Sequence, residues 1–230
     1  MLLISNLIYL KVKNRRKLLK ISCWNSDWAT PSSKRGKFFI DKFDSDIICL
    51  TEGYETLLPH DGYIISSHED YGYKSKKGRR KVILWSKNKW TDIDQIGSKE
   101  IPTGRFISGI TNGIKIIGLC IPWRFAHVST GRKDRKPWED HLSFIQNLSF
   151  LNQKTIILGD FNQIIPKKNQ PEIVFSSLNN MIDGFNLLTT NMGLIHIVIS
   201  TDLIAESIEK IATENNSDHD GISCLINFKN

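Results

Sequence analysis

Residues 155–163, TIILGDFNQ, join a short apolar run to a polar end, and the interpretation of the whole sequence depends on them. The run 155–158 is β-branched and aliphatic, which predicts a buried strand. Asp160 and Asn162 follow Gly159. One interpretation is that Gly, Asp and Asn form the turn that closes the strand. The other is that alternation along an extended chain places Asp160 and Asn162 on one face, where both can meet a common ligand.

The composition indicates one large folded domain. The 230 residues are 40% hydrophobic and include six Trp, which is enough for a substantial core, and the 24% of charged residues is ordinary. The net charge of +7 is less ordinary. It favours a polyanionic partner, and composition alone leaves nucleic acid and an anionic membrane surface both open. Without repeats, linkers or breaks in composition, a single domain over residues 17–230 is expected.

The cysteines and the first residues bear on the compartment. Cys23, Cys49, Cys120 and Cys224 lie far apart without a CxxC pair, which favours reduced core thiols in a cytoplasmic protein over a zinc site. Residues 1–16 are expected to be an N-terminal extension. Its apolar stretch is too short to span a bilayer, and its basic cluster follows the apolar part, the reverse of a secretory signal. No stable membrane insertion is expected, and a monomer is the default.

Strands interrupted by a few helices are expected along the chain. The pattern predicts strands at 17–25, 46–52, 81–87, 105–111, 114–122, 155–163 and 194–201, with a last strand after the polar loop that starts at residue 217. Helices are expected at 35–45, 136–151, 172–180 and 202–212. The first of these helices connects two strands as a crossover unit. Asn112-Gly113 is the strongest hairpin signal in the sequence.

Polar side chains recur at the ends of the predicted strands. Because strand ends on one side of a sheet converge, we expect them to form one site. Their carboxylate and amide oxygens suit Mg²⁺ or Mn²⁺ better than zinc, and a histidine can move a proton near neutral pH. A cation, a proton mover and basic surroundings are what hydrolysis of a phosphate ester requires. The residues are Asn25, Glu52, Asp160, Asn162, Asp218 and His219.

Five short segments in order carry a resemblance to a known family. SCWN, ICLTE, PTGRF, LGDFN and SDHDG resemble the endonuclease/exonuclease/phosphatase superfamily, over nearly the whole chain from about Leu18 to Phe228. That superfamily includes apurinic endonucleases, pancreatic-type deoxyribonucleases, inositol-polyphosphate phosphatases and neutral sphingomyelinases. The resemblance implies an α/β fold, a four-layer sandwich of two mixed β-sheets flanked by helices. It also implies a divalent-metal phosphodiesterase or phosphatase.

The resemblance also implies roles for individual residues. Glu52 is the expected main metal ligand, with Asn25 beside it and Asp218 as a second carboxylate on the metal side. Arg105, in PTGRF, matches a recurrent Gly-Arg of the family and is expected to be structural or near the substrate.

Three further residues take catalytic roles on the same basis. Asp160 is expected to orient or deprotonate the attacking water, and Asn162 to hold the phosphate or the developing charge. His219 is expected to be either the general base or a phosphate-binding imidazole.

The sequence departs from the family pattern at two positions. Ile195 stands where members usually carry an Asp that orients the catalytic His, so His219 is expected to lack its usual partner. Cys120 stands where a His or Tyr often precedes the Pro, and Cys is a weaker donor to phosphate. Arg124 or His127, just downstream, are candidates to replace it.

The basic runs 74–81 and 131–136 are either solvated loops or a surface that tracks a phosphate backbone. The substrate-binding candidates in the first run are Lys77, Arg79 and Arg80.

The leading hypothesis is a Mg²⁺- or Mn²⁺-dependent nuclease that hydrolyses nucleic-acid phosphodiesters, DNA more than RNA. The alternatives are a phosphatase or phospholipid phosphodiesterase of the same fold, and a nucleic-acid-binding homologue with impaired catalysis.

Overall fold

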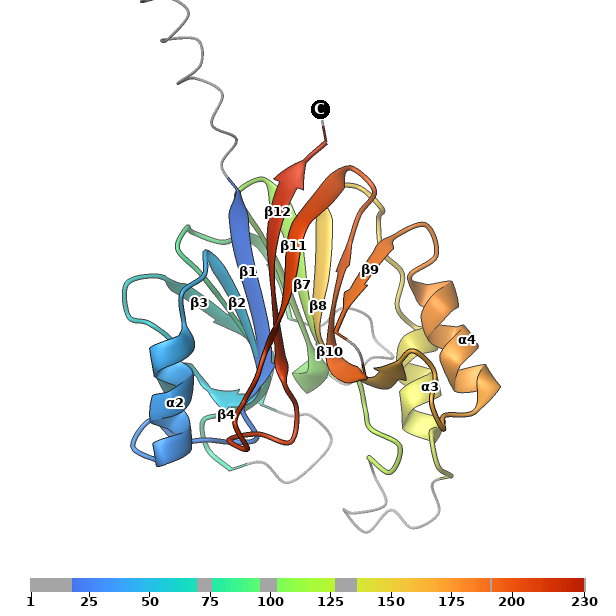
Figure 1. The fold of residues 1–230 in the computed structure, drawn as a ribbon, viewed down its shortest axis with the longest axis horizontal. Coiled ribbons are helices and arrows are strands. Elements are labelled where there is room, and N and C mark those ends of the chain that lie inside the picture. The colour runs from blue at the N-terminus through green and yellow to red at the C-terminus, as the bar shows by residue number, and fades with distance from the viewer. Residues whose placement is uncertain (1–17, 70–75, 96–102, 127–135, 191, 230) are drawn as a thin grey trace, which may run out of the picture.

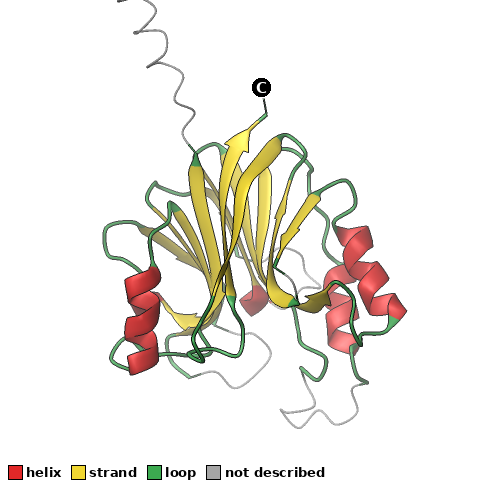
Figure 2. Cartoon of the chain, viewed as in Figure 1, coloured by secondary structure: helices red, strands yellow, loops and turns green. Residues whose placement is uncertain are grey.

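The fold is a sandwich of two six-stranded β-sheets that face each other, with helices on the outside (Figures 1 and 2). The computed structural model describes residues 18–69, 76–95, 103–126, 136–190 and 192–229. Helix α2 covers one sheet, and helices α3 and α4 cover the other. This arrangement confirms the expected four-layer α/β sandwich. The expected extension, residues 1–16, lies outside the described residues.

The first sheet contains both ends of the described chain. Its strand order is β11-β12-β1-β2-β4-β3. β1 and β2 are parallel and the other neighbours antiparallel, and α2 connects β1 to β2 as the expected crossover. The bounds are β1 Leu19–Asn25, β2 Ile47–Tyr54, β3 Tyr63–Ser66, β4 Arg79–Ser86, β11 Leu203–Ile211 and β12 Gly221–Phe228.

The middle of the chain forms the second sheet, in the order β5-β6-β7-β8-β10-β9. Here β7 and β8 are the parallel pair, and α3 lies between them in the chain. Asn112 and Gly113 both have positive φ, 55° and 73°, which confirms the hairpin turn between β6 and β7. The bounds are β5 Thr91–Asp94, β6 Phe106–Thr111, β7 Ile114–Cys120, β8 Thr155–Ile165, β9 Asn186–Thr189 and β10 Gly193–Ile199.

The three α-helices of the described residues pack their apolar sides on the sheets. α2 (Lys34–Lys42) begins where the Ser33 hydroxyl accepts a hydrogen bond from Gly36 N, and it buries Phe39. α4 spans Glu172–Met181, as expected. α3 is shorter than the expected 136–151, because Trp138 has a left-handed φ of 69° and the helix runs only over Glu139–Gln146. Short 3₁₀ turns, η1 and η2, lie at Glu55–Leu57 and Thr103–Arg105.

The helix expected at 202–212 is wrong, because these residues form the edge strand β11. Ile204, Ile208 and Ile211 have helical spacing, which misled the prediction. A register shift between Ala205 and Ser207 interrupts the alternation with β12. Ile204 and Ile208 are partly exposed at this edge, so their spacing does not mark a buried helix face.

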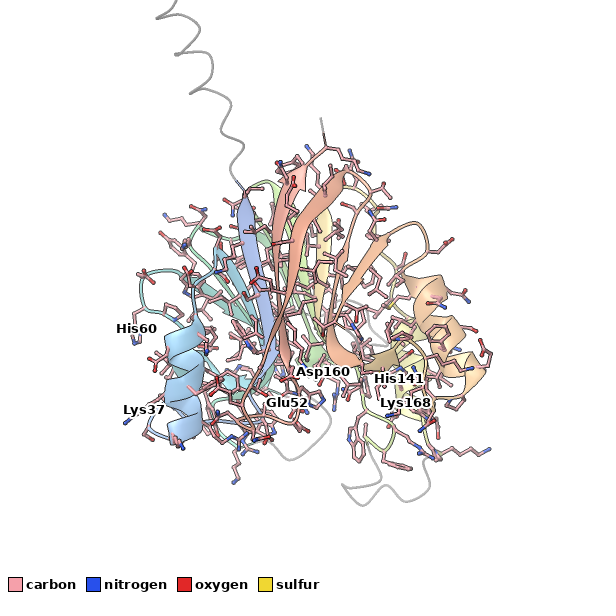
Figure 3. All side chains as sticks on the ribbon, viewed as in Figure 1. Lys37, Glu52, His60, His141, Asp160 and Lys168 are labelled. Atoms are coloured by element: carbon pink, nitrogen blue, oxygen red, sulfur yellow. The ribbon has the colours of Figure 1, made fainter. Side chains whose placement is uncertain are left out.

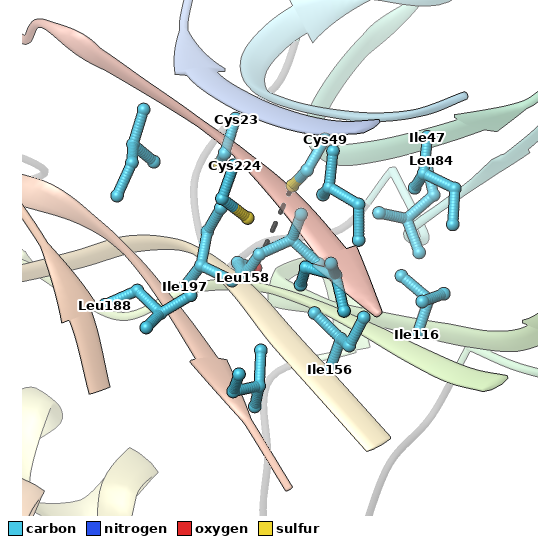
Figure 4. Packing of buried hydrophobic residues seen from close by; sticks show 14 of the residues in the cluster. Cys23, Ile47, Cys49, Leu84, Ile116, Ile156, Leu158, Leu188, Ile197 and Cys224 are labelled. Carbon is cyan, nitrogen blue, oxygen red and sulfur yellow. Dashed lines mark hydrogen bonds between the residues drawn. The ribbon is translucent and has the colours of Figure 1, made fainter. Parts of the chain in front are cut away.

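The main core fills the space between the two sheets. It is built from aliphatic residues with all four cysteines, which are buried free thiols, as expected. Figure 4 shows part of this cluster, with the Cys49 thiol directed at the carbonyl of Leu158 across the sandwich, 3.8 Å from Sγ to O. Separate apolar clusters hold α2 on the first sheet and α3 with α4 on the second. Within the described residues, no helix has the length and apolar character needed to cross a membrane.

Candidate active site

Asp160 lies at the centre of a polar cluster at one end of the sandwich. The preceding Gly159 has φ 151°, and a Cβ there would lie 1.9 Å from Leu119 O, so only glycine lets β8 approach β7 so closely. Asp160 is 2% exposed. Its Oδ2 accepts a hydrogen bond from Asn25 Nδ2 and its Oδ1 accepts one from Asn162 N, both at 3.0 Å. Asn25 belongs to the first sheet, so this contact joins the two sheets.

The two amides of the cluster are fixed by backbone contacts. Asn25 Oδ1 accepts a hydrogen bond from Asp27 N at 2.8 Å, which directs its amino group at Asp160. Asn162 has a left-handed φ of 52° in an irregular part of the β8–β10 pairing, and its Nδ2 donates to Ile121 O at 2.8 Å. Positive φ is unusual for a non-glycine residue, and such strain is concentrated at functional sites.

His219 faces Asp160 from the loop before β12. Its Nε2 lies 3.9 Å from Asp160 Oδ2, and its Nδ1 lies 2.5 Å from Asp218 Oδ1. Asp218, the expected second carboxylate on the metal side, thus contacts the histidine. Ile195 stands where the orienting acid of His219 was expected to be missing, and Asp218 is an acid that reaches the ring from the adjacent position. Ile195 is paired opposite Asp160 and is buried in the core between the sheets.

The environment shifts the pKa values of both groups upward. Burial raises the pKa of Asp160, and the nearby Glu52 carboxylate raises it further, against the opposing effects of His219, Asn25 and Asn162. Burial lowers the pKa of His219, but the carboxylates of Asp160 and Asp218 outweigh it, and the net pKa is raised. His219 is thereby biased towards its charged form, and Asp160 is a stronger base than an exposed aspartate.

Glu52 reaches the cluster from β2. Its φ of 51° is left-handed, and β2 pairs with β4 on either side of it, Thr51 with Val82 and Gly53 with Arg80. Lys81 lies between those partners, and its Nζ forms an ion pair with Glu52 Oε1. Figure 3 shows Glu52 and Asp160 at the same end of the sandwich.

Sequence reasoning did not identify Lys81 as a site residue. It was counted in the basic run 74–81, but it begins the buried part of β4 and is itself 5% exposed. No signal in the sequence placed it there, because its contact with Glu52 depends on how β4 aligns with β2.

The oxygen donors of the cluster suit a hard divalent cation. Glu52 offers a carboxylate, and Asn25 offers an amide oxygen that already accepts one backbone hydrogen bond. Among the described residues, no three His, Cys, Asp or Glu side chains are grouped as a complete ligand set. Mg²⁺ is commonly held by one or two carboxylates together with substrate phosphates, and this donor set matches that pattern. The ammonium of Lys81 lies on the carboxylate that the cation would use.

Arg105 is buried behind the cluster. Its Nη1 donates to Cys120 O at 3.2 Å, and it is 2% exposed. Burial raises the pKa of the Cys120 thiol to about 12, so this residue stays neutral among the charges of Lys81, Asp160 and Arg105. Cys120 pairs with Asp160 across β7 and β8.

The remaining basic candidates lie in different surroundings. Arg79 is stacked 4.5 Å over the ring of Trp28, on the same side of β4 as Lys81. Arg80 faces Glu55 and Glu69, with an Nη1–Oε1 distance of 2.7 Å to the latter. Lys77 and Arg124 are exposed, Arg124 next to the ring of Phe125. His127 lies outside the described residues.

Comparison with known proteins identifies the family. The sandwich with acid, amide and imidazole groups at one end is the architecture expected of a phosphoester hydrolase. Residues 39–167 match the model of the Endonuclease/Exonuclease/phosphatase family, which is more than half of the chain. The chain therefore belongs to this family, whose members are hydrolases that act on phosphoesters and generally use divalent metals. No curated protein matches the sequence.

Solved structures with the same fold are distant in sequence. An AP endonuclease from Archaeoglobus fulgidus aligns with a TM-score of 0.66 and 14% identity, over 92% of this chain and 100% of that one. The 3′ phosphatase NExo from Neisseria aligns at 0.62 and 14%, over 92% and 99%. The endonuclease domain of TRAS1, a telomere-specific non-LTR retrotransposon, aligns at 0.61 and 13%, over 93% and 100%. At these identities the likeness concerns the fold.

Proposed function

We propose that this protein is a divalent-metal-dependent nuclease that hydrolyses phosphodiester bonds of nucleic acid, DNA more than RNA. The observation that carries the proposal is the convergence of Asn25, Asp160 and His219 from two sheets, with Glu52 beside them. The proposed setting is the cytoplasm, where the four buried thiols stay reduced. The similar solved structures include a nuclease and a 3′ phosphatase that was bound to a DNA hairpin, which supports a nucleic-acid substrate.

Asp160 is the proposed base for the attacking water. Its carboxylate is held by Asn25 and by Asn162 N, so both oxygens are oriented before substrate binds. Its raised pKa brings its basicity closer to that required at neutral pH. The arrangement also leaves Asp160 next to a proton carrier, because His219 Nε2 is 3.9 Å away.

His219 and Asn162 are proposed to stabilise the phosphate. The raised pKa of His219 favours an imidazolium, whose Nε2–H is directed into the cluster while Asp218 holds Nδ1. Asn162 uses one amide hydrogen for Ile121 O, which leaves the second hydrogen of Nδ2 for a phosphate oxygen. Glu52 and Asn25 would hold Mg²⁺ or Mn²⁺, which neutralises phosphate charge when it is bound.

The first test is cleavage of a supercoiled plasmid and of end-labelled DNA and RNA oligonucleotides by the full chain, in Mg²⁺, Mn²⁺ and EDTA. Asp160→Ala removes the proposed base, and we expect the rate to fall by roughly 10²-fold or more. The matched control is Asp183→Ala, an exposed aspartate after α4, whose rate should equal that of the unmodified protein. Circular dichroism checks that both variants fold. Unchanged cleavage by folded Asp160→Ala would contradict the assignment.

A second candidate is a nucleic-acid-binding protein with weak catalysis. The observation in its favour is the ion pair between Lys81 and Glu52, which engages the expected main metal ligand. Binding of oligonucleotides without turnover in either metal would select this candidate. Turnover of a 3′-phosphorylated oligonucleotide alone would instead indicate a phosphatase.

A further inference from the structure

The ammonium of Lys81 occupies a protected position in the candidate site. Its side chain is 7% exposed and that of Glu52 is 21% exposed. Other ion pairs of this protein are far more open, as in Lys87–Asp46, where the lysine side chain is 51% exposed. The ring of Trp28, whose centroid lies 5.2 Å from Lys81 Nζ, covers another side of the ammonium. The Lys81–Glu52 pair is therefore shielded from water and salt far more than a surface ion pair.

The backbone places the two side chains opposite each other. Glu52 has the left-handed φ of 51°, and Lys81 faces it across the β2–β4 ladder. Lysine has a compact charge at the end of a flexible stem, so it can reach a carboxylate where no metal is present and withdraw when another cation arrives. The negative charge of Asp160, which also acts on Glu52, favours a cation at this place.

We propose that Lys81 is a built-in competitor for the divalent cation, which must displace the ammonium from Glu52 in order to bind. The proposal rests on the proposed function, because it concerns the metal ligand of that site. It predicts that the unmodified protein binds divalent cations weakly, and that Lys81 sets the metal concentration at which the site fills. Removing one charge of a shielded ion pair leaves the other uncompensated, so the carboxylate then takes a cation more readily.

The test is Mn²⁺ binding to the full chain, measured by electron paramagnetic resonance without substrate. Lys81→Met keeps an unbranched side chain only one atom shorter and removes its charge, and we expect at least tenfold tighter binding than in the unmodified protein. The matched control is Lys87→Met, which breaks the Lys87–Asp46 pair just beyond the end of β4. Its Mn²⁺ affinity should equal that of the unmodified protein.

Thermal unfolding gives a second readout that does not require activity. Lys81→Met should have a lower Tm than the unmodified protein in EDTA and a larger rise in Tm on addition of Mn²⁺. The double variant Lys81→Met/Glu52→Gln should lose both the tight binding and this rise.

Equal Mn²⁺ affinity with and without Lys81 would overturn the inference, as would a gain that survives Glu52→Gln. The proposed function can fail independently, since it is judged by cleavage and the inference by metal binding.

Discussion

At the scale of single residues, the imidazole of His219 is held by its neighbour in sequence. Asp218 accepts a hydrogen bond from Nδ1, which leaves Nε2 as the ring nitrogen that faces Asp160. Within the described part of the chain, Nε2 has no hydrogen-bond partner although it is buried. Such an atom is costly to bury unless a ligand satisfies it, which is consistent with a phosphate or water binding there.

Asp218→Asn tests whether this contact supports the charged ring. The amide lacks the charge that helps to raise the pKa of His219, so the imidazolium is less populated, and we expect kcat to fall by roughly tenfold or more with little change in KM. Nitrogen-15 NMR of the imidazole should show the ring losing its proton at a lower pH than in the unmodified protein. Asp183→Asn is the matched control, and an unaltered titration for Asp218→Asn would count against this role of Asp218.

The sequence predicted the members of the cluster better than their contacts. Strand ends and the family resemblance identified Asn25, Glu52, Asp160 and His219, and the structure places these together. The partners of Glu52 and Asp218 depend on strand register and on loop conformation, which a single sequence does not encode locally. Lys81 was missed for that reason.

At the scale of elements, Gln163 on β8 ties α3, α4 and β10 together through two buried histidines. Its side-chain Nε2 donates to His141 Nε2 and to Val174 O, both at 2.8 Å. The backbone carbonyl of Gln163 accepts a hydrogen bond from His196 Nε2, also at 2.8 Å. His141 Nδ1 donates to Pro122 O at 2.7 Å. Burial lowers the pKa of both histidines to about 4, so both are neutral in the folded protein at neutral pH.

These two histidines make stability fall in acid. Above about pH 6.5 both histidines are neutral in the folded and in the unfolded protein. Between about pH 6.5 and pH 4 they bind protons in the unfolded chain but stay neutral in the folded protein. Each should lower the free energy of unfolding by about 1.4 kcal/mol per pH unit in that window. Urea unfolding between pH 7 and 5 measures the slope, which His196→Gln should reduce by one histidine's share. The exposed His60→Gln is the control, and equal slopes in all three proteins would disprove the account.

Element prediction succeeded where one rule dominated and failed at an edge. Asn112-Gly113 fixed its hairpin because positive φ at two consecutive positions suits few other residues. β11 was taken for a helix because Ile204 and Ile208 lie four residues apart, a spacing that fits one face of a helix as well as the exposed face of an edge strand. Residues 203–211 form a strand and not a helix because they pair with β12. β12 is close in the chain, but it is held in place by the rest of the sheet.

At the scale of the molecule, only some of the positively charged side chains are placed where they can contact a polyanion at the site. The net charge is +7, but Arg80 is committed to Glu55 and Glu69, while Arg79 lies with Lys81 over Trp28 beside the site. A phosphate backbone that crosses the site would meet Arg79 before Arg80. Total charge therefore attracts a polyanion, and the local pairing decides which cations contact it.

Salt dependence separates these two arginines. Fluorescence anisotropy of a labelled oligonucleotide, between 50 and 200 mM NaCl, should show affinity falling with salt as counterions are released. Arg79→Ala should weaken binding and reduce the slope of log K against log salt by about 1. Arg80→Ala should leave the slope unchanged because its charge is already paired. Equal effects of the two substitutions, or no salt dependence, would contradict this picture.

The strand order carries a consequence for synthesis of the protein. β12, the last strand of the described residues, pairs with β1, the first, Leu19 lying opposite Ile226. His219 enters the site on the loop that leads into β12. A chain translated only as far as β11 therefore lacks both the imidazole and the strand that completes the sheet. Whatever reaction the site performs, it can begin only after β12 has been made and has paired with β1.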